Sequence, residues 1–155
     1  MHLDGPYKYV LDFLPGFSLP TTIGDGVKTF IAPVTKKKSP KIYVFSSKRR
    51  VIYIGQTIQP IRDRIRQGVQ ADGSGGYYGY QCLREIGQVD IYIWLVKACP
   101  DDNASDHLEC IEAEAVYLVR AISGQWPKCQ NEIHFHNTKR RHRALAVELL
   151  EPYLL

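Results

Sequence analysis

Two tyrosines, an arginine and a carboxylate occupy positions in the sequence from which they could act together. Tyr43 and Tyr53 lie in two neighbouring apolar segments, Arg64 follows in an amphipathic segment, and Glu114 lies in a later one. A phenol can orient or deprotonate water, and a guanidinium offsets the charge of a phosphate. A carboxylate can hold a metal ion that acts as a Lewis acid. If the fold brings the four side chains together, they suit hydrolysis of a phosphodiester.

Both tyrosines fall in segments rich in β-branched and aromatic residues. Lys41–Phe45 and Val51–Gly55 are predicted strands that a short polar turn joins, so they should pair as an antiparallel hairpin. If Tyr43 and Tyr53 lie opposite or diagonally across this hairpin, both hydroxyls project on one face. Gly55 removes a side chain where another backbone or a ligand must come close, or it simply allows a bend before the next helix.

A helix is predicted to begin at Pro60, a residue favoured in the first turn. Apolar residues recur at helical spacing after it and leave the arginines of this segment toward the flanks. Arg64 lies one turn past Pro60, and its planar guanidinium could donate two hydrogen bonds to a phosphate. The alternative is an ordinary surface arginine.

A later helix, predicted from Asp106 to about Ile122, carries two carboxylates at the edges of its buried stripe. Glu112 and Glu114 each lie about 80° from the centre of that stripe, so periodicity does not choose between them. A carboxylate at the edge of a core costs free energy unless it is paired or holds a cation. An ion pair is therefore the alternative to a metal site for either residue.

The remaining elements complete an α+β architecture. We predict a further helix at Tyr77–Ile86, a third strand at Val89–Val96, and a last helix at Lys139–Leu150. Together with the hairpin they predict a small three-stranded antiparallel sheet flanked by helices, over residues 41–155. Residues 1–40, rich in Gly and Pro, are predicted to form an N-terminal extension with room for one or two strands.

Positive charge is clustered rather than spread along the chain. Four groups of Lys and Arg contrast with acidic residues gathered near Asp101, in the helix that follows and at the C-terminus. Such clusters are typical of a polyanion-binding protein, and solvated loop tips and helix faces explain them equally well. One group is Lys36-Lys37-Lys38, and the candidates for DNA contact come from the other three: Lys48, Arg49, Arg50, Arg62, Arg66, Lys139, Arg140, Arg141 and Arg143.

The cysteines and the hydropathy pattern bear on the compartment. Cys82, Cys99, Cys110 and Cys129 lack the paired spacing of a zinc site, and no secretory signal precedes them. We therefore expect reduced, mostly buried thiols in a cytoplasmic protein. The longest apolar run, Ile91–Val96, is too short to span a bilayer.

Five segments in this order resemble the GIY-YIG nuclease superfamily. Lys41-Ile42-Tyr43 and Tyr53-Ile54-Gly55 resemble its paired strand motifs, and Pro60–Ile65 resembles its strand-to-helix junction, with the family's arginine at Arg64. Ile111–Leu118 resembles the helix that bears the metal-binding glutamate, which would be Glu114. Pro127–Asn131 resembles the closing segment, whose asparagine would be Asn131. The likeness covers residues 41–131.

The resemblance implies a DNA endonuclease that uses one divalent cation, Mg²⁺ or Mn²⁺. In that scheme Tyr43 helps to activate water, Tyr53 positions water or phosphate, and Arg64 binds the scissile phosphate. Glu114 coordinates the metal and Asn131 holds the geometry of the site. DNA contacts would come from the nine basic residues named above. The chain would be a stand-alone, restriction-like nuclease without membrane contact, acting as a homodimer when it cuts both strands of a duplex.

Two residues depart from the family pattern. Lys41 stands where the first motif usually opens with glycine, and Gly68 stands where many relatives carry a histidine. If a histidine assists, His107, His134 or His136 must supply it. Three alternatives remain: an inactive nucleic-acid-binding module on the same scaffold, a nuclease for repair or branched DNA, and a structural protein whose tyrosines are only sheet residues.

Overall fold

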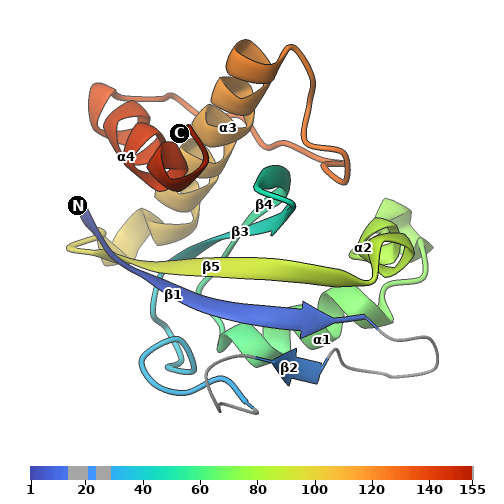
Figure 1. The fold of residues 1–155 in the computed structure, drawn as a ribbon. Coiled ribbons are helices and arrows are strands. Elements are labelled where there is room, and N and C mark those ends of the chain that lie inside the picture. The colour runs from blue at the N-terminus through green and yellow to red at the C-terminus, as the bar shows by residue number, and fades with distance from the viewer. Residues whose placement is uncertain (14–20, 24–28, 155) are drawn as a thin grey trace.

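A computed structural model of the chain describes residues 1–13, 21–23 and 29–154, with the backbone alone for 21–23 and Asp101. Its centre is an antiparallel sheet of five strands in the order β2-β1-β5-β3-β4 (Figure 1). The strands are β1 (His2–Asp12), β2 (Thr21–Ile23), β3 (Lys41–Ser47), β4 (Arg50–Thr57) and β5 (Gln88–Lys97). The helices are α1 (Ile61–Gln70), α2 (Gln81–Ile86), α3 (Ala104–Ser123) and α4 (Arg140–Leu150), with 3-10 turns at Ser74–Gly76, Asp101–Asn103 and Glu151–Tyr153.

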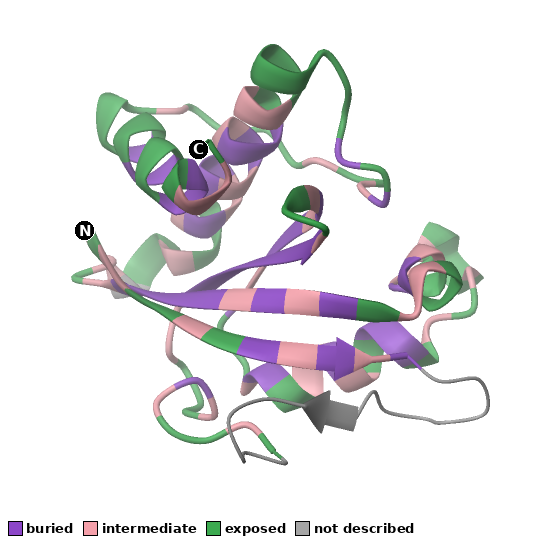
Figure 2. Cartoon of the chain, in the orientation of Figure 1, coloured by how far each residue is buried: buried purple, intermediate pink, exposed green. Residues whose placement is uncertain are grey.

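The predicted α+β class is confirmed, but the sheet has five strands rather than three, because the strands allowed for in the N-terminal extension belong to it. β1 pairs with β5 along almost its whole length, from His2↔Lys97 to Asp12↔Gln88. Its last residues alternate, with Tyr9 and Leu11 buried, which anchors the strand in the core (Figure 2). The first part of the predicted extension is therefore a strand of the sheet. Residues 14–20 and 24–28 of that extension lie outside the described part of the chain.

The predicted hairpin is present, and its register places both tyrosines on one face. Tyr43 pairs with Gly55 and Phe45 pairs with Tyr53, so the two tyrosines are diagonal neighbours. The register shifts beyond Phe45, where β4 contains an extra residue. A bulge of this kind bends a strand and is often found beside a functional site.

Helices cover both faces of the sheet and bury two apolar clusters. On one face, α1 and α2 pack against Tyr43, Phe45 and the buried residues of β1 and β5. On the other face, α3 and α4 pack against Ile42, Val44 and Ile54. Because successive residues of a strand point to opposite faces, β3 is buried on both of its faces. The two clusters fix α1 and α3 on opposite sides of β4.

Two predicted helix starts differ from the structure. α2 begins at Gln81 rather than Tyr77, because Gly79 has φ of +52° and interrupts the helical path. α3 begins at Ala104, with Asn103 rather than Asp106 at its N-cap. The last turn of α3 projects beyond the sheet, which leaves Ile122 60% exposed despite its place in the predicted stripe (Figure 2).

The cysteines are not all reduced thiols, contrary to our expectation. Cys82 on α2 and Cys129 in the loop after α3 form a disulfide across 47 residues of sequence, with their Cα atoms 5.6 Å apart. Spacing along the chain gave no sign of this pair because the two segments meet only in the folded protein.

None of the described helices is both long and apolar enough to cross a membrane.

Candidate active site

A cavity of about 450 Å³ lies beside β4, between α1 and α3. Four parts of the chain form its walls: β4, α1, the loop before α2, and α3 with the loop that follows it. The lining residues are Tyr53, Gln56, Arg64, Gly76, Tyr77, Tyr78, Gly79, Glu109, Glu112, Asn131, Glu132 and His134. Three of the five predicted site residues, Tyr53, Arg64 and Asn131, are therefore brought to one cavity.

Tyr43 lies directly behind this cavity rather than in its wall. Its side chain is fully buried, and its ring stacks on that of Tyr53 with 6.2 Å between the ring centroids. Tyr53 is partly exposed and lines the cavity. Burial raises the pKa of Tyr53 well above that of a free phenol, so its hydroxyl is a neutral hydrogen-bond donor at ordinary pH. Of the two phenols, Tyr53 is the one that a ligand can reach.

Arg64 joins the buried tyrosine to the cavity. Its Nε donates a hydrogen bond of 3.1 Å to the hydroxyl of Tyr43, and its guanidinium lies 5.6 Å from the ring centre of Tyr77. The neighbouring Tyr43 hydroxyl raises the pKa of Arg64, so the guanidinium stays charged. Because Nε is turned toward Tyr43, the two Nη groups are the donors best placed to meet an anion in the cavity.

Of the two glutamates that periodicity could not separate, Glu112 and not Glu114 lines this cavity. Glu114 forms an ion pair with Arg143 on α4, with 3.2 Å between its Oε2 and Nε of the arginine. Two steps along a helix turn a side chain by about 200°, so Glu114 faces α4 while Glu112 faces the cavity. The position of Glu114 does not suit the role of metal ligand that we predicted for it. Glu112, which periodicity left open, takes that place in our proposal.

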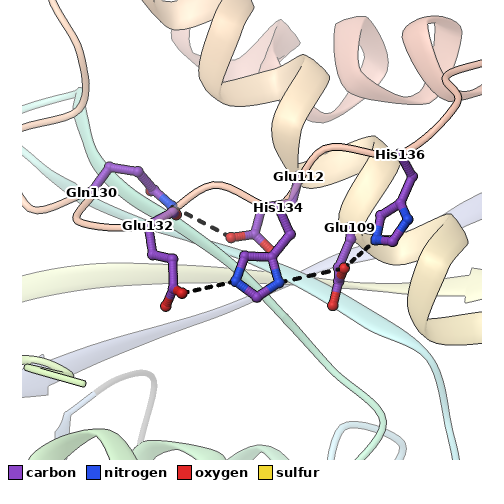
Figure 3. Close-up of polar contacts among 6 residues, drawn as sticks. All are labelled: Glu109, Glu112, Gln130, Glu132, His134 and His136. Carbon is purple, nitrogen blue, oxygen red and sulfur yellow. Dashed lines mark hydrogen bonds and ion pairs between the residues drawn. The ribbon is translucent and has the colours of Figure 1, made fainter. Parts of the chain in front are cut away.

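The carboxyl of Glu112 is held in a poorly solvated position. Burial raises its pKa to about 8, although the charge of Arg64 opposes this shift. Nε2 of Gln130 lies 3.4 Å from one of its oxygens (Figure 3). One long hydrogen bond does not offset the loss of water around a carboxylate. The ionised form of Glu112 would therefore be stabilised by a cation in the cavity.

Gln130 performs the bracing role that we predicted for its neighbour Asn131. Its Oε1 accepts a hydrogen bond of 3.0 Å from the backbone N–H of Ile54, and its Nε2 donates to the backbone oxygen of Glu132 at 3.1 Å. The backbone N–H of Cys129 also donates to the oxygen of Ile52 at 2.8 Å. The loop thus pairs with the outer edge of β4. Asn131 is exposed and lines the cavity.

A network of acids and histidines lies beside the cavity and contributes Glu109, Glu132 and His134 to its wall (Figure 3). His134 lies between two carboxylates, 3.0 Å from Glu132 and 3.6 Å from Glu109. The hydrogen bond to Glu132 is the main cause of a raised pKa of His134. Glu109 is also 2.5 Å from Nε2 of His136. Of the three histidines considered as substitutes for the missing one, only His134 lines this cavity; His107 contacts His142 instead.

Lys41, which stands where the first motif usually has glycine, has a structural role. Its side chain is fully buried, and its Nζ donates to the backbone oxygens of Ser39, Lys36 and Gln59 at 2.7, 2.9 and 3.0 Å. Burial lowers the pKa of this ammonium group to about 8. Lys41 therefore ties the segment before β3 to the segment after β4, at a distance from the cavity.

The nine basic residues predicted to contact DNA do not line this cavity, and they lie in three separate places. Arg49 and Arg50 border a groove of about 610 Å³ together with Trp126 and Lys128. Arg66 borders another hollow, of about 570 Å³, beside Lys37 and Lys38. The remaining six are exposed. Lys48 lies on the hairpin turn and Arg62 on α1, and the start of α4 carries Lys139, Arg140, Arg141 and Arg143.

Comparison of the chain with models of protein families, with characterised proteins and with solved structures found no match. The likeness to the GIY-YIG superfamily therefore depends on the quoted motifs alone.

The residues of the cavity are compatible with one divalent cation. Among the described residues, no three His, Cys, Asp or Glu side chains are grouped so that they could enclose a metal ion. Mg²⁺, however, commonly uses one or two carboxylates and takes its other ligands from water and phosphate oxygens. Glu112 offers such a carboxylate, with Glu109 and Glu132 also in the wall. Without a cation, any ionised carboxylates of this wall would repel a phosphate.

Proposed function

We propose that this protein is a metal-dependent DNA endonuclease of the GIY-YIG type, which hydrolyses phosphodiester bonds in the cavity beside β4. The observation that carries the proposal is the convergence of Tyr53, Arg64 and Glu112 on that cavity from three different elements. A phenol, a guanidinium and a carboxylate are the groups that this hydrolysis needs. A protein in which the tyrosines only stabilised the sheet would not require the arginine and the buried carboxylate to meet there.

Arg64 is the proposed phosphate-binding residue. Tyr43 holds its Nε, so the guanidinium has a fixed orientation before any ligand arrives. The Nη groups can then donate to two oxygens of one phosphate and stabilise the negative charge that grows as water attacks. This order of contacts gives Tyr43 a positioning role and does not require it to touch the attacking water.

Tyr53 and Glu112 act on the other side of the phosphate. The neutral phenol of Tyr53 can donate a hydrogen bond to a phosphate oxygen or orient a water molecule. Glu112 is the proposed ligand of Mg²⁺ or Mn²⁺, with Gln130 fixing its carboxylate. A bound cation would polarise the phosphate and favour ionisation of a water molecule. Asn131, an exposed residue of the cavity wall, is proposed to contact the substrate.

The test is cleavage of supercoiled plasmid and of branched and single-stranded oligonucleotides, with magnesium or with EDTA. Glu112→Gln removes the proposed metal ligand and keeps the shape of the side chain. Glu114→Gln is the matched control, since Glu114 lies on the same helix but faces Arg143. We expect magnesium-dependent cleavage that Glu112→Gln abolishes and Glu114→Gln retains.

Other outcomes would decide against the proposal or revise it. Loss of cleavage in Glu114→Gln alone would restore the assignment made from the sequence. Salt-sensitive DNA binding without cleavage by the wild type would favour an inactive binding module. Preferential cutting of branched DNA would favour a repair nuclease over a restriction-like one, and dimer formation on duplex DNA would support paired strand cuts.

A further inference from the structure

Tyr80 occupies the space beside α1 that Gly68 leaves open. A Cβ placed on Gly68 would lie 2.7 Å from Cζ of Tyr80 and closer still to two other carbons of its ring. The backbone N–H of Tyr80 donates to the backbone oxygen of Gly68 at 2.8 Å. This hydrogen bond holds the main chains of the two residues close together. A histidine at position 68 and the ring of Tyr80 could not both fit in these positions. The second departure from the family pattern therefore has a physical counterpart in Tyr80.

The hydroxyl of Tyr80 is the first group in a chain of hydrogen bonds that leads to the cavity. It lies 2.7 Å from the hydroxyl of Tyr43, which accepts a hydrogen bond of 3.1 Å from Nε of Arg64. Because the guanidinium can only donate, the oxygen of Tyr43 must be the acceptor in that second bond. Tyr43 is thus held from both sides, by a phenol on one and by the cavity's arginine on the other.

Tyr80 is in no position to contact a ligand itself. Its side chain is fully buried, and its ring packs edge-to-face against Phe45 and Tyr53 at 5.2 and 5.5 Å. A buried hydroxyl needs a hydrogen-bond partner, and Tyr43 supplies one here. Since the neighbouring rings prevent Tyr80 from turning away, the position of its hydroxyl is set by the core.

We propose that Tyr80 is a positioning residue for the arginine of the active site, acting through Tyr43. This inference rests on the proposed nuclease function, because it assigns Tyr80 a part in orienting Arg64 toward a phosphate. The chain from Tyr80 to Tyr43 to Arg64 keeps the guanidinium in one orientation. Less conformational entropy is then lost when the reactive geometry forms.

The first test is Tyr80→Phe, which removes the hydroxyl and keeps the ring. We expect kcat for cleavage of a DNA oligonucleotide to fall about tenfold, with KM and the unfolding midpoint close to those of the wild type. In Tyr43→Phe the same hydrogen-bond chain is already broken, so Tyr43→Phe/Tyr80→Phe should be no slower than Tyr43→Phe alone. Tyr9→Phe is the control, because Tyr9 on β1 is buried in the same apolar cluster but packs against Phe30.

A second measurement needs no cleavage and so separates this inference from the proposed function. The Nε–H group of Arg64 should give a distinct nitrogen–proton NMR signal, assigned by its disappearance in Arg64→Lys. We expect that signal to shift and to exchange faster with solvent in Tyr80→Phe, and to be unchanged in Tyr9→Phe. If the wild type cuts no DNA but this shift occurs, the chain of hydrogen bonds stands and the nuclease proposal fails.

Three results would overturn the inference. One is an Arg64 signal that Tyr80→Phe leaves unchanged. Another is a fall in kcat that Tyr9→Phe reproduces, since this would mean that any buried hydroxyl matters equally. The third is a further loss of activity when Tyr80→Phe is added to Tyr43→Phe, since this would mean that Tyr80 acts by a route other than Tyr43.

Discussion

The ring of Tyr43 on β3 packs over the Cα of Gly55 on β4. It occupies the space that a side chain at position 55 would fill. The two residues are partners in the sheet, and a Cβ on Gly55 would lie 2.8 Å from Cε2 of Tyr43 and closer to its Cζ and hydroxyl oxygen. The glycine is therefore required by the tyrosine opposite it. This relationship gives a physical reason for a tyrosine in the first motif and a glycine in the second.

Gly55→Ala should consequently displace the ring of Tyr43. We expect a loss of about 1–3 kcal/mol in the free energy of unfolding, measured with urea, because the added methyl group overfills a packed site. The hydrogen bond between Tyr43 and Arg64 should weaken as well, so cleavage should fall more than binding of uncut DNA.

The matched control is Gly55→Ala in a Tyr43→Leu background, where that ring is absent. There the same substitution should cost little stability. An equal cost in both backgrounds would mean that backbone strain at position 55, rather than contact with Tyr43, causes the loss.

Glu112 should make the effect of magnesium depend on pH. Its carboxyl has a pKa raised by burial to about 8, against about 4.3 in an unfolded chain. Between these values the folded protein holds a proton that the unfolded chain has lost, so stability falls as pH rises toward 8. Magnesium binds the ionised carboxylate, so it should raise the unfolding midpoint more at about pH 9 than at about pH 6. Scanning calorimetry with magnesium or EDTA measures both effects.

Glu112→Gln should remove the shift caused by magnesium at both pH values, while Glu114→Gln should retain it. A magnesium-induced shift that persists in Glu112→Gln would place the cation elsewhere, whatever the outcome of the cleavage assay.

The sequence predicted the parts of this protein whose signals are local. The strands of the hairpin are rich in β-branched and aromatic residues and lie close together along the chain, so their antiparallel pairing was predicted. The register then meets the stated condition for Tyr43 and Tyr53 to share a face. Glu112 and Glu114 could not be separated in this way, because both flank the same buried stripe. Contacts with Arg143 on one side and with the cavity on the other distinguish them, and these form only in the folded chain.

Long-range pairing also explains what the sequence did not predict. A strand was allowed for in the N-terminal extension, but β1 joins the central sheet only through its pairing with β5, about 85 residues later, while Gly5 and Pro6 interrupt its local pattern. Tyr80 falls within the helix predicted at Tyr77–Ile86, where no pattern singles it out, and its role depends on contact with Gly68. In both cases the deciding contact joins two segments far apart in the sequence or of different type, and hydrophobic periodicity does not predict that they meet.

The disulfide between Cys82 and Cys129 should stabilise the protein and hold the site together. It connects α2 to the loop in which Gln130 braces Glu112. Closing a loop of this length lowers the entropy of the unfolded chain by an amount worth about 4 kcal/mol in the chain-entropy model. Reduction should therefore lower the free energy of unfolding by up to about that amount, as urea titration with and without dithiothreitol would show.

Cys82→Ser/Cys129→Ser should resemble the reduced wild type and should not respond to the reductant. Its cleavage rate should also fall, because the loop that carries Gln130 loses its attachment to α2. If the wild type unfolds identically with and without the reductant, the two cysteines are not bonded in solution.

His142 should make the packing of α4 sensitive to acid. Its Nδ1 accepts a hydrogen bond of 3.0 Å from the backbone N–H of Lys139, so its Nε2 carries the proton and donates to Nδ1 of His107 at 3.0 Å. Burial lowers the pKa of His142 to about 4, against about 6.5 in an unfolded chain. Between these values the unfolded chain binds a proton that the folded one does not, so stability falls as pH falls.

We therefore expect the free energy of unfolding to be lower at about pH 5 than at about pH 7.5, with His142 contributing on the order of 1 kcal/mol. His142→Asn keeps an acceptor near Lys139 but cannot be protonated, so its stability should change less over the same range. Other groups titrate in this range too, so the difference between the two chains is the quantity to measure. Equal pH dependence in wild type and variant would mean that His142 can accept its proton without disturbing α4.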